Sequence, residues 1–125
     1  MKKKYIPTEE HRAEFRQYLD KWRNLMGLMD WRIHLKEEPA ADVLADVQVF
    51  LVDRLARVRL GKAWAEPITS EGLESTAIHE LLHVLLEDVT ASAASKNEDW
   101  KASAEHGVIA ILEQLLMSTT LVDKA

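Results

Sequence analysis

Two histidines, His79 and His83, flank a glutamate in the segment His79-Glu80-Leu81-Leu82-His83. Residues four apart on an α-helix lie one turn above each other and only about 40° apart around its axis, so both imidazoles can reach one ion. A glutamate directly after the first histidine has the position of a general base that takes a proton from a zinc-activated water. The spacing therefore predicts zinc chemistry, with His79 and His83 as ligands and Glu80 as the base.

The motif is a specific signal in a chain of this composition. With five histidines in 125 residues, chance would produce HExxH roughly 0.02 times. The surrounding residues predict a helix over 73–89 that is apolar around most of its circumference, with both histidines at the edge of the apolar sector. Ligands at that edge would be supported by the core and open to a cleft. The alternative is a pair of ordinary helix histidines with a solvated glutamate between them.

A zinc site with an open coordination position needs a third protein ligand. The chain has no cysteine, so this ligand must be His, Asp or Glu. A helix predicted over 97–117 offers Glu98, Glu105, His106 and Glu113. Glu105 points into the middle of the apolar face of this helix, where an unpaired carboxylate would be unfavourable, so it is the preferred third ligand. His106 and Glu98 are the other candidates, and a buried ion pair with a basic residue of the first helix is the alternative role for Glu105.

Peptide-bond hydrolysis also needs a hydrogen-bond donor for the oxyanion beside the metal. Tyr5 and Tyr18 are the only tyrosines, and both precede the predicted strands. His106, next to the preferred ligand, is therefore the candidate for this catalytic role. Its alternatives are an ordinary histidine at the edge of the helix or a residue that orients a ligand.

The elements that position these residues form one α+β domain. A helix is predicted over 8–27, and period-two alternation predicts a strand over 31–36. A Val- and Leu-rich segment over 43–60 predicts a hairpin that turns at 52–54. Ser70 is the candidate N-cap of the HExxH helix, and a C-terminal helix follows.

Length and composition support one soluble domain. A chain of 125 residues corresponds to a single domain, and its ends, 1–7 and 118–125, are expected to fray. The net charge of −5 divides into +3 over 1–62 and −8 over 63–125, which disfavours non-specific nucleic-acid binding. No apolar run approaches the ~18 residues of a membrane span, and no apolar segment follows the N-terminal lysines as in a signal peptide. We therefore expect a cytoplasmic protein with no membrane partner.

HExxH followed by Glu105 on the next helix resembles the zincin metallopeptidases, in the gluzincin arrangement of two histidines and a downstream glutamate. A strand that begins with Trp31, then a hairpin and the HExxH helix, is similar to the order in small SprT-like and ImmA/IrrE-like zincin domains. The resemblance implies that His79 and His83 are metal ligands and Glu80 the general base. It implies Glu105 as the third ligand of one zinc ion, or another first-row divalent metal, per chain. The chain lacks the Asn-Glu-x-x-Ser-Asp signature around the third glutamate and the cysteine zinc ribbon of SprT proteins.

The resulting prediction is a minimal zinc metallopeptidase that cleaves a peptide or protein substrate in a cytosolic, bacterial or phage setting. Two alternatives stay open. One is a non-catalytic, metal-binding regulatory module, because so short a chain leaves few residues for a substrate cleft. The other is a zincin protease that acts beside nucleic acid through a basic cluster, which is otherwise a solvated hairpin face: Arg54, Arg57, Arg59 and Lys62.

Overall fold

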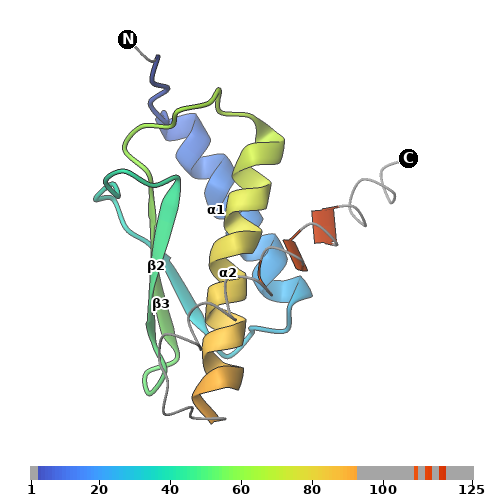
Figure 1. The fold of residues 1–125 in the computed structure, drawn as a ribbon. Helices are drawn as coiled ribbons and strands as arrows, with labels where there is room; N and C mark the ends of the chain where they lie inside the picture. The colour runs from blue at the N-terminus through green and yellow to red at the C-terminus, as the bar shows by residue number, and fades with distance from the viewer. Residues whose placement is uncertain (1–2, 93–108, 110–111, 114–115, 118–125) are drawn as a thin grey trace.

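The structure is a computed structural model that describes residues 3–92, 109, 112–113 and 116–117. Its elements follow in the order α1 (Glu9–Leu25), β1 (Arg32–Leu35), β2 (Ala45–Phe50), β3 (Leu55–Leu60) and α2 (Ser70–Ser92). Both helices lie on one side of the sheet (Figure 1). The predicted α+β class and the three strands are confirmed. None of the described helices combines the length and apolar character that crossing a membrane requires.

The first helix begins at a reciprocal cap. The hydroxyl of Thr8 accepts a hydrogen bond from the His11 N–H at 3.3 Å, and His11 Nδ1 accepts one from the Thr8 N–H at 3.0 Å. Together they satisfy two backbone donors that a helix start leaves without intrahelical partners. The inward face then buries Phe15, Leu19 and Trp22, so α1 is a core helix.

The sheet is mixed, with strand order β1-β3-β2. β1 runs parallel to the central strand β3, and β2 runs antiparallel to it. Ala56, Val58 and Leu60 of β3 are at most 2% exposed and form the core face. Arg57 and Arg59 alternate with them, so they lie on the outer face. In the described part of the chain, β2 pairs only with β3 and is an edge strand.

The helix that carries the HExxH motif, α2, begins three residues before the predicted start at Leu73. Thr69 rather than Ser70 supplies the cap, because its hydroxyl accepts a hydrogen bond from the Gly72 N–H at 3.0 Å. The core-facing residues of α2 are almost fully buried: Leu73, Ala77, Ile78, Leu81, Leu82 and Val84.

A buried polar junction holds α1 against α2. Glu74 is only 2% exposed, and its Oε2 accepts hydrogen bonds from Lys21 Nζ at 2.7 Å and from Trp22 Nε1 at 2.8 Å. His79 and His83 lie about 140° and 180° around the helix from Glu74. The junction that turns Glu74 towards α1 therefore turns both histidines away from it.

Candidate metal centre

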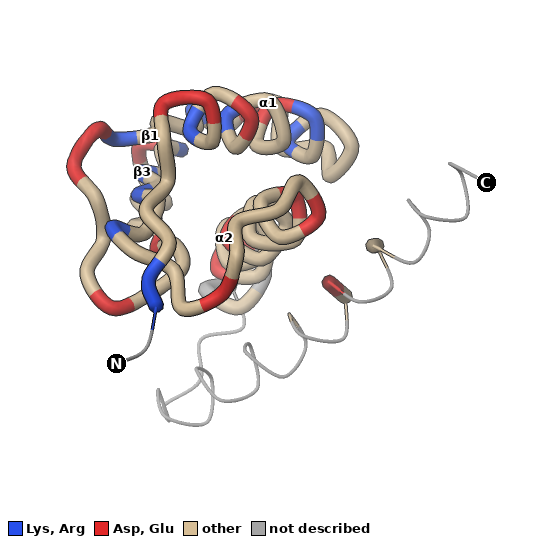
Figure 2. Tube along the Cα trace, turned by 90° about the horizontal axis from the view of Figure 1, so that it is seen from above, with Lys and Arg blue, Asp and Glu red and all other residues tan. Residues whose placement is uncertain are grey.

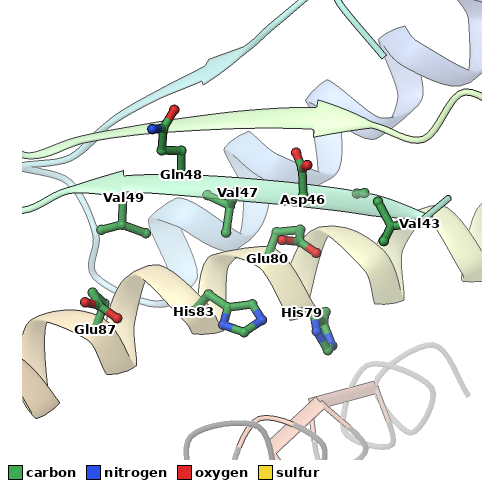
Figure 3. A pocket seen from close by; sticks show the side chains of 10 residues that line it. Val43, Asp46, Val47, Gln48, Val49, His79, Glu80, His83 and Glu87 are labelled. Atoms are coloured by element: carbon green, nitrogen blue, oxygen red, sulfur yellow. The ribbon is translucent and has the colours of Figure 1, made fainter. Parts of the chain in front are cut away.

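His79 and His83 project from the same side of α2 (Figure 3). Their ring centroids are 5.0 Å apart and the ring planes meet at 68°. Both side chains are half-buried, so each ring is supported by the protein and open to the pocket beside it. Two imidazoles so close on one helix can occupy two positions of a tetrahedral zinc ion. The structure thus brings together the two histidines that the sequence predicts as ligands.

Glu80 lies between α2 and β2 (Figure 3) and is 5% exposed. Among the described residues, none donates a hydrogen bond to its carboxyl group. Burial raises the pKa of Glu80 to about 7; the nearby His79 opposes this shift, and Asp46 and Glu113 add to it. A carboxyl group with a pKa near neutrality can both accept and release a proton at neutral pH.

An open pocket of about 560 Å³ separates α2 from the edge strand β2. Val47 and Val49 point towards α2, whereas Asp46 and Gln48 point to the opposite side of the strand (Figure 3). Residues from both faces of β2 nevertheless line the pocket, so it follows the free edge of the strand. Its walls are Val43, Ala45, Asp46, Val47, Gln48 and Val49 on one side, and His79, Glu80, His83 and Glu87 on the other.

Among the residues that the structure describes, the outer edge of β2 has no strand partner, and it offers backbone hydrogen-bonding groups to this pocket. The Gly61 N–H donates to the Leu44 carbonyl at 2.7 Å, which makes Leu44 and Gly61 a hydrogen-bonded antiparallel pair. Such pairs alternate along a ladder. The N–H and C=O groups of Ala45, Val47 and Val49 are therefore directed away from β3, towards the open edge.

The segment before β2 forms the wall next to His79, and Gly61 holds it in place. Val43 and Leu44 line a second pocket of about 310 Å³ that adjoins His79. A Cβ atom on Gly61 would lie 2.1 Å from the Val43 oxygen and 2.8 Å from the Leu44 oxygen. Only glycine at position 61 allows this close approach of the two backbones.

Glu113 contacts the first histidine from outside α2. Its Oε2 lies 2.9 Å from His79 Nδ1, and its Oε1 accepts a hydrogen bond from the Ser75 hydroxyl. The bond to Glu113 raises the pKa of His79, although burial opposes this. Burial alone would raise the pKa of Glu113, but the bonds from His79 and Ser75 outweigh it and lower that pKa.

A carboxylate on Nδ1 is the arrangement that orients a metal-binding histidine, because it fixes the tautomer and leaves Nε2 as the ligand atom. In the sequence, Glu113 is one of the acids of the predicted C-terminal helix, and no pattern there assigns it a role. The signal that could have found it is its position at the edge of the apolar face, where a side chain can reach a neighbouring helix. Glu87 was also missed; it follows His83 by one helical turn and lines the same pocket.

Glu105, the preferred third ligand, lies outside the described residues, as do His106 and Glu98. Within the described part of the chain, no three His, Asp or Glu side chains are grouped so that they could hold a metal ion. The described residues therefore supply two imidazole ligands for a metal ion and a carboxylate that orients one of the two rings. Of the tyrosines, Tyr18 donates to Glu14 at 2.8 Å and does not line the pocket.

No protein-family model, curated protein or solved structure matches the chain. The chemistry of the site is therefore inferred from its own residues and their geometry. The resemblance to zincins stays an expectation from the sequence, based on the HExxH motif and the predicted order of the elements.

Proposed function

We propose that the protein is a zinc-dependent metallopeptidase of the zincin type that hydrolyses peptide bonds in a peptide or protein substrate. One observation carries the proposal. His79 and His83 stand side by side on α2, next to the buried carboxyl group of Glu80. All three line a pocket along the outer edge of β2. Glu105 is proposed to complete the ligand set, with one metal ion per chain.

A divalent metal at these imidazoles would act as a Lewis acid and lower the pKa of water. Glu80 would accept a proton from the attacking water and return it to the leaving amine. Glu113 would hold the His79 ring through Nδ1. His106 is the proposed donor to the oxyanion.

The free edge of β2 suits an extended peptide. The outward backbone groups of Ala45, Val47 and Val49 could pair with a substrate strand, since an exposed sheet edge binds peptides by adding a strand. A peptide bound there would pass along the pocket wall that contains Glu80. The edge strand would thus position a peptide bond against the catalytic residues.

The proposal has two parts, zinc binding and peptide cleavage. A measurement of metal content tests the first. Protein purified without added metal or chelator should contain close to one zinc ion per chain by elemental mass spectrometry. His79→Ala and His83→Ala should each lose it. A folded wild-type protein that takes up no zinc on dialysis would contradict the proposal.

Cleavage of a broad peptide library, read by mass spectrometry, tests the second half. Glu80→Gln should retain zinc and lower kcat by about 10²- to 10⁴-fold, the usual contribution of a general base. Glu71→Gln is the matched control, because Glu71 is an exposed residue in the first turn of the same helix. Bound zinc without cleavage of any peptide would instead indicate the non-catalytic metal-binding module.

A further inference from the structure

A second groove follows the opposite edge of the sheet, between β1 and α1. β1 lies beside α1 (Figure 2), and the Arg12 guanidinium donates a hydrogen bond to the Lys36 carbonyl at 3.0 Å, which ties the helix to the end of the strand. The groove has a volume of about 1060 Å³, and no residue of the candidate metal centre lines it. We call it the β1 groove; its lining residues include Arg12, Arg16, His34, Leu35 and Lys36.

The outer edge of β1 offers backbone hydrogen-bonding groups to this groove. In the described part of the chain, β3 is the only strand that pairs with β1. The N–H groups of Arg32 and Lys36 donate to carbonyls on the β3 side at 2.9 and 2.8 Å. Alternate residues of a parallel strand direct their N–H and C=O groups to opposite sides. The backbone groups of Ile33 and Leu35 therefore point away from β3, towards the open edge.

Positive side chains flank this edge on both faces of the sheet. Arg16 follows Arg12 by one turn of α1, is exposed, and forms no ion pair with a described carboxylate. On the strand, Arg32 and Lys36 alternate with the buried Leu35 and so point to the face opposite the core. The side chains of a strand added at this edge would therefore meet arginines of α1 on one face and cations of β1 on the other.

Three carboxylates also line the groove, but they gather at one end of it. Glu9 lies in the first turn of α1, and Glu37 and Glu38 follow the end of β1. Glu38 is 3.8 Å from Lys36 and 3.5 Å from an arginine of β3, so its charge is partly compensated. The part of the groove around Arg16 therefore stays positive.

The pocket beside α2 has the opposite charge. Asp46, Glu80 and Glu87 line it, and its described lining includes no lysine or arginine. The two edges of the sheet thus differ in the charge that they present to a chain lying along them. This difference directs an acidic segment to the edge of β1 rather than to the edge of β2.

We propose that the β1 groove binds an extended, acidic segment of a partner protein, which adds to the sheet as a further strand. The outward backbone groups of Ile33 and Leu35 pair with the backbone of the segment, and Arg16 binds its carboxylates. A nucleic-acid strand has no amide groups to pair with a strand edge, so the groove favours a peptide. The site is independent of the metallopeptidase chemistry, since no groove residue is a proposed metal ligand or the proposed base.

Fluorescence anisotropy with a labelled octapeptide of alternating glutamate and valine, blocked at both ends, tests the proposal. Wild-type protein should bind this peptide saturably, and more weakly when the salt concentration rises from about 50 mM to about 150 mM. The same peptide with glutamine in place of glutamate should bind at least about fivefold more weakly. Addition of a chelator should leave the affinity unchanged, and mass spectrometry confirms that the peptide stays intact.

An N-methylated form of the octapeptide tests the strand addition itself. Methylation of every backbone nitrogen keeps the carboxylates and removes all the N–H donors that could pair with β1. This form should lose saturable binding, because charge alone would hold it without the backbone pairing.

Arg16→Glu locates the binding site. It should weaken binding of the octapeptide at least about fivefold, because it replaces an attractive charge with a repulsive one. Lys62→Glu is the matched control, since Lys62 is exposed and lies outside the groove, and its binding should stay within about twofold of wild type. Circular dichroism confirms that each variant folds, and Arg16→Gln is a milder substitute if Arg16→Glu does not.

Four outcomes would overturn the proposal. The first is no saturable binding of the octapeptide at the lower salt. The second is equal weakening by Arg16→Glu and Lys62→Glu, which would show a general effect of charge. The third is undiminished binding of the N-methylated form, or loss of binding on chelation, which would exclude strand addition at β1. The fourth is binding of a labelled oligothymidylate in place of the octapeptide, lost in Arg16→Glu, which would assign the groove to nucleic acid.

Discussion

Two buried glutamates on α2, six residues apart, occupy opposite situations. Glu74 is 2% exposed, and its carboxylate accepts hydrogen bonds from Lys21 and Trp22. Glu80 is 5% exposed, and no described residue donates a hydrogen bond to it. Burial of a charged group is unfavourable unless the group is paired. Glu74 therefore stabilises the contact between two helices, whereas Glu80 retains the reactivity that an unpaired carboxyl group brings to a pocket.

Glu113 is an intermediate case. It is partly buried and binds His79 and Ser75, so its charge is stabilised, but its partner is a predicted metal ligand. Glu74 and Glu80 are almost equally buried and differ in their neighbours. Neighbours, rather than depth, separate the structural acid Glu74 from the proposed general base Glu80.

The largest effect is expected at the structural glutamate. Glu74→Ala should lower the free energy of unfolding by about 3 kcal/mol, because Trp22 Nε1 loses its acceptor and Lys21 its counter-ion. Urea unfolding followed by circular dichroism measures it. Glu71→Ala, at an exposed position of the same helix, is the control and should change little. A loss below about 0.5 kcal/mol in Glu74→Ala would mean that the junction is not a stabilising contact.

Substitution of Glu80, the proposed general base, should change the free energy of unfolding in the opposite direction. The folded-state pKa of Glu80, about 7, lies above its ordinary value of 4.5, so the folded state favours the neutral form. Its contribution to stability is complete below pH 4.5 and is lost as the pH rises towards 7. Glu80→Gln, which cannot ionise, should therefore stabilise the metal-free protein by about 2 kcal/mol at pH 8.

At pH 4 the same substitution should be nearly neutral. Urea unfolding of chelator-treated protein at both pH values gives the comparison, with Glu71→Gln as the control. Equal effects of Glu80→Gln at pH 4 and pH 8 would show that the pKa of Glu80 is not raised. The contrast with Glu74 would then disappear.

For Glu113, the intermediate case, the prediction concerns zinc affinity. The variant Glu113→Gln tests whether the carboxylate that contacts His79 supports zinc binding. Loss of the carboxylate on Nδ1 of a ligand histidine typically weakens metal binding by 10- to 100-fold, and we expect about tenfold, or about 1.4 kcal/mol. Competition with a chromophoric chelator measures the affinity, and Glu71→Gln again serves as the control. An unchanged zinc affinity would indicate that Glu113 only supports the packing around Ser75.

The smallest effect concerns one of the two donors to Glu74. Trp22→Phe removes the indole N–H and keeps most of the buried ring, so it should destabilise the protein by about 1 kcal/mol. A double-mutant cycle with Glu74→Ala isolates the coupling between the two groups. Additive effects would assign the strength of the junction to Lys21 instead.

The sequence predicted α1, the hairpin and the HExxH helix because each has a local signal: the Thr8 cap, alternation after the turn predicted at 52–54, and helical apolar periodicity. Two features of the fold could not be predicted from the sequence, for physical reasons. The start of α2 at Ser70 lies in a polar segment without periodicity. The helix begins there because the hydroxyl of Thr69 caps it. The pairing of β1 with β3 rather than β2 depends on contacts between distant segments.

The residues of the candidate site also differ in whether the sequence alone could predict them. His79, Glu80 and His83 could be found because their spacing within one helix is itself the signal. Glu113 reaches His79 from 34 residues further along the chain. The direction of a side chain on its own helix does not say which neighbour it meets, so its role depended on tertiary packing. Glu105 and His106 stay predictions.

The strand order has a kinetic consequence. β2 and β3 are joined by the short turn at 51–54, and hairpins of this kind close within microseconds. β1 can join β3 only after the intervening segment has formed a longer loop, which is slower. We therefore expect the edge strand beside the HExxH helix to be in register before the parallel strand is added. Substitutions in the hairpin should then slow folding, whereas those in β1 should chiefly accelerate unfolding.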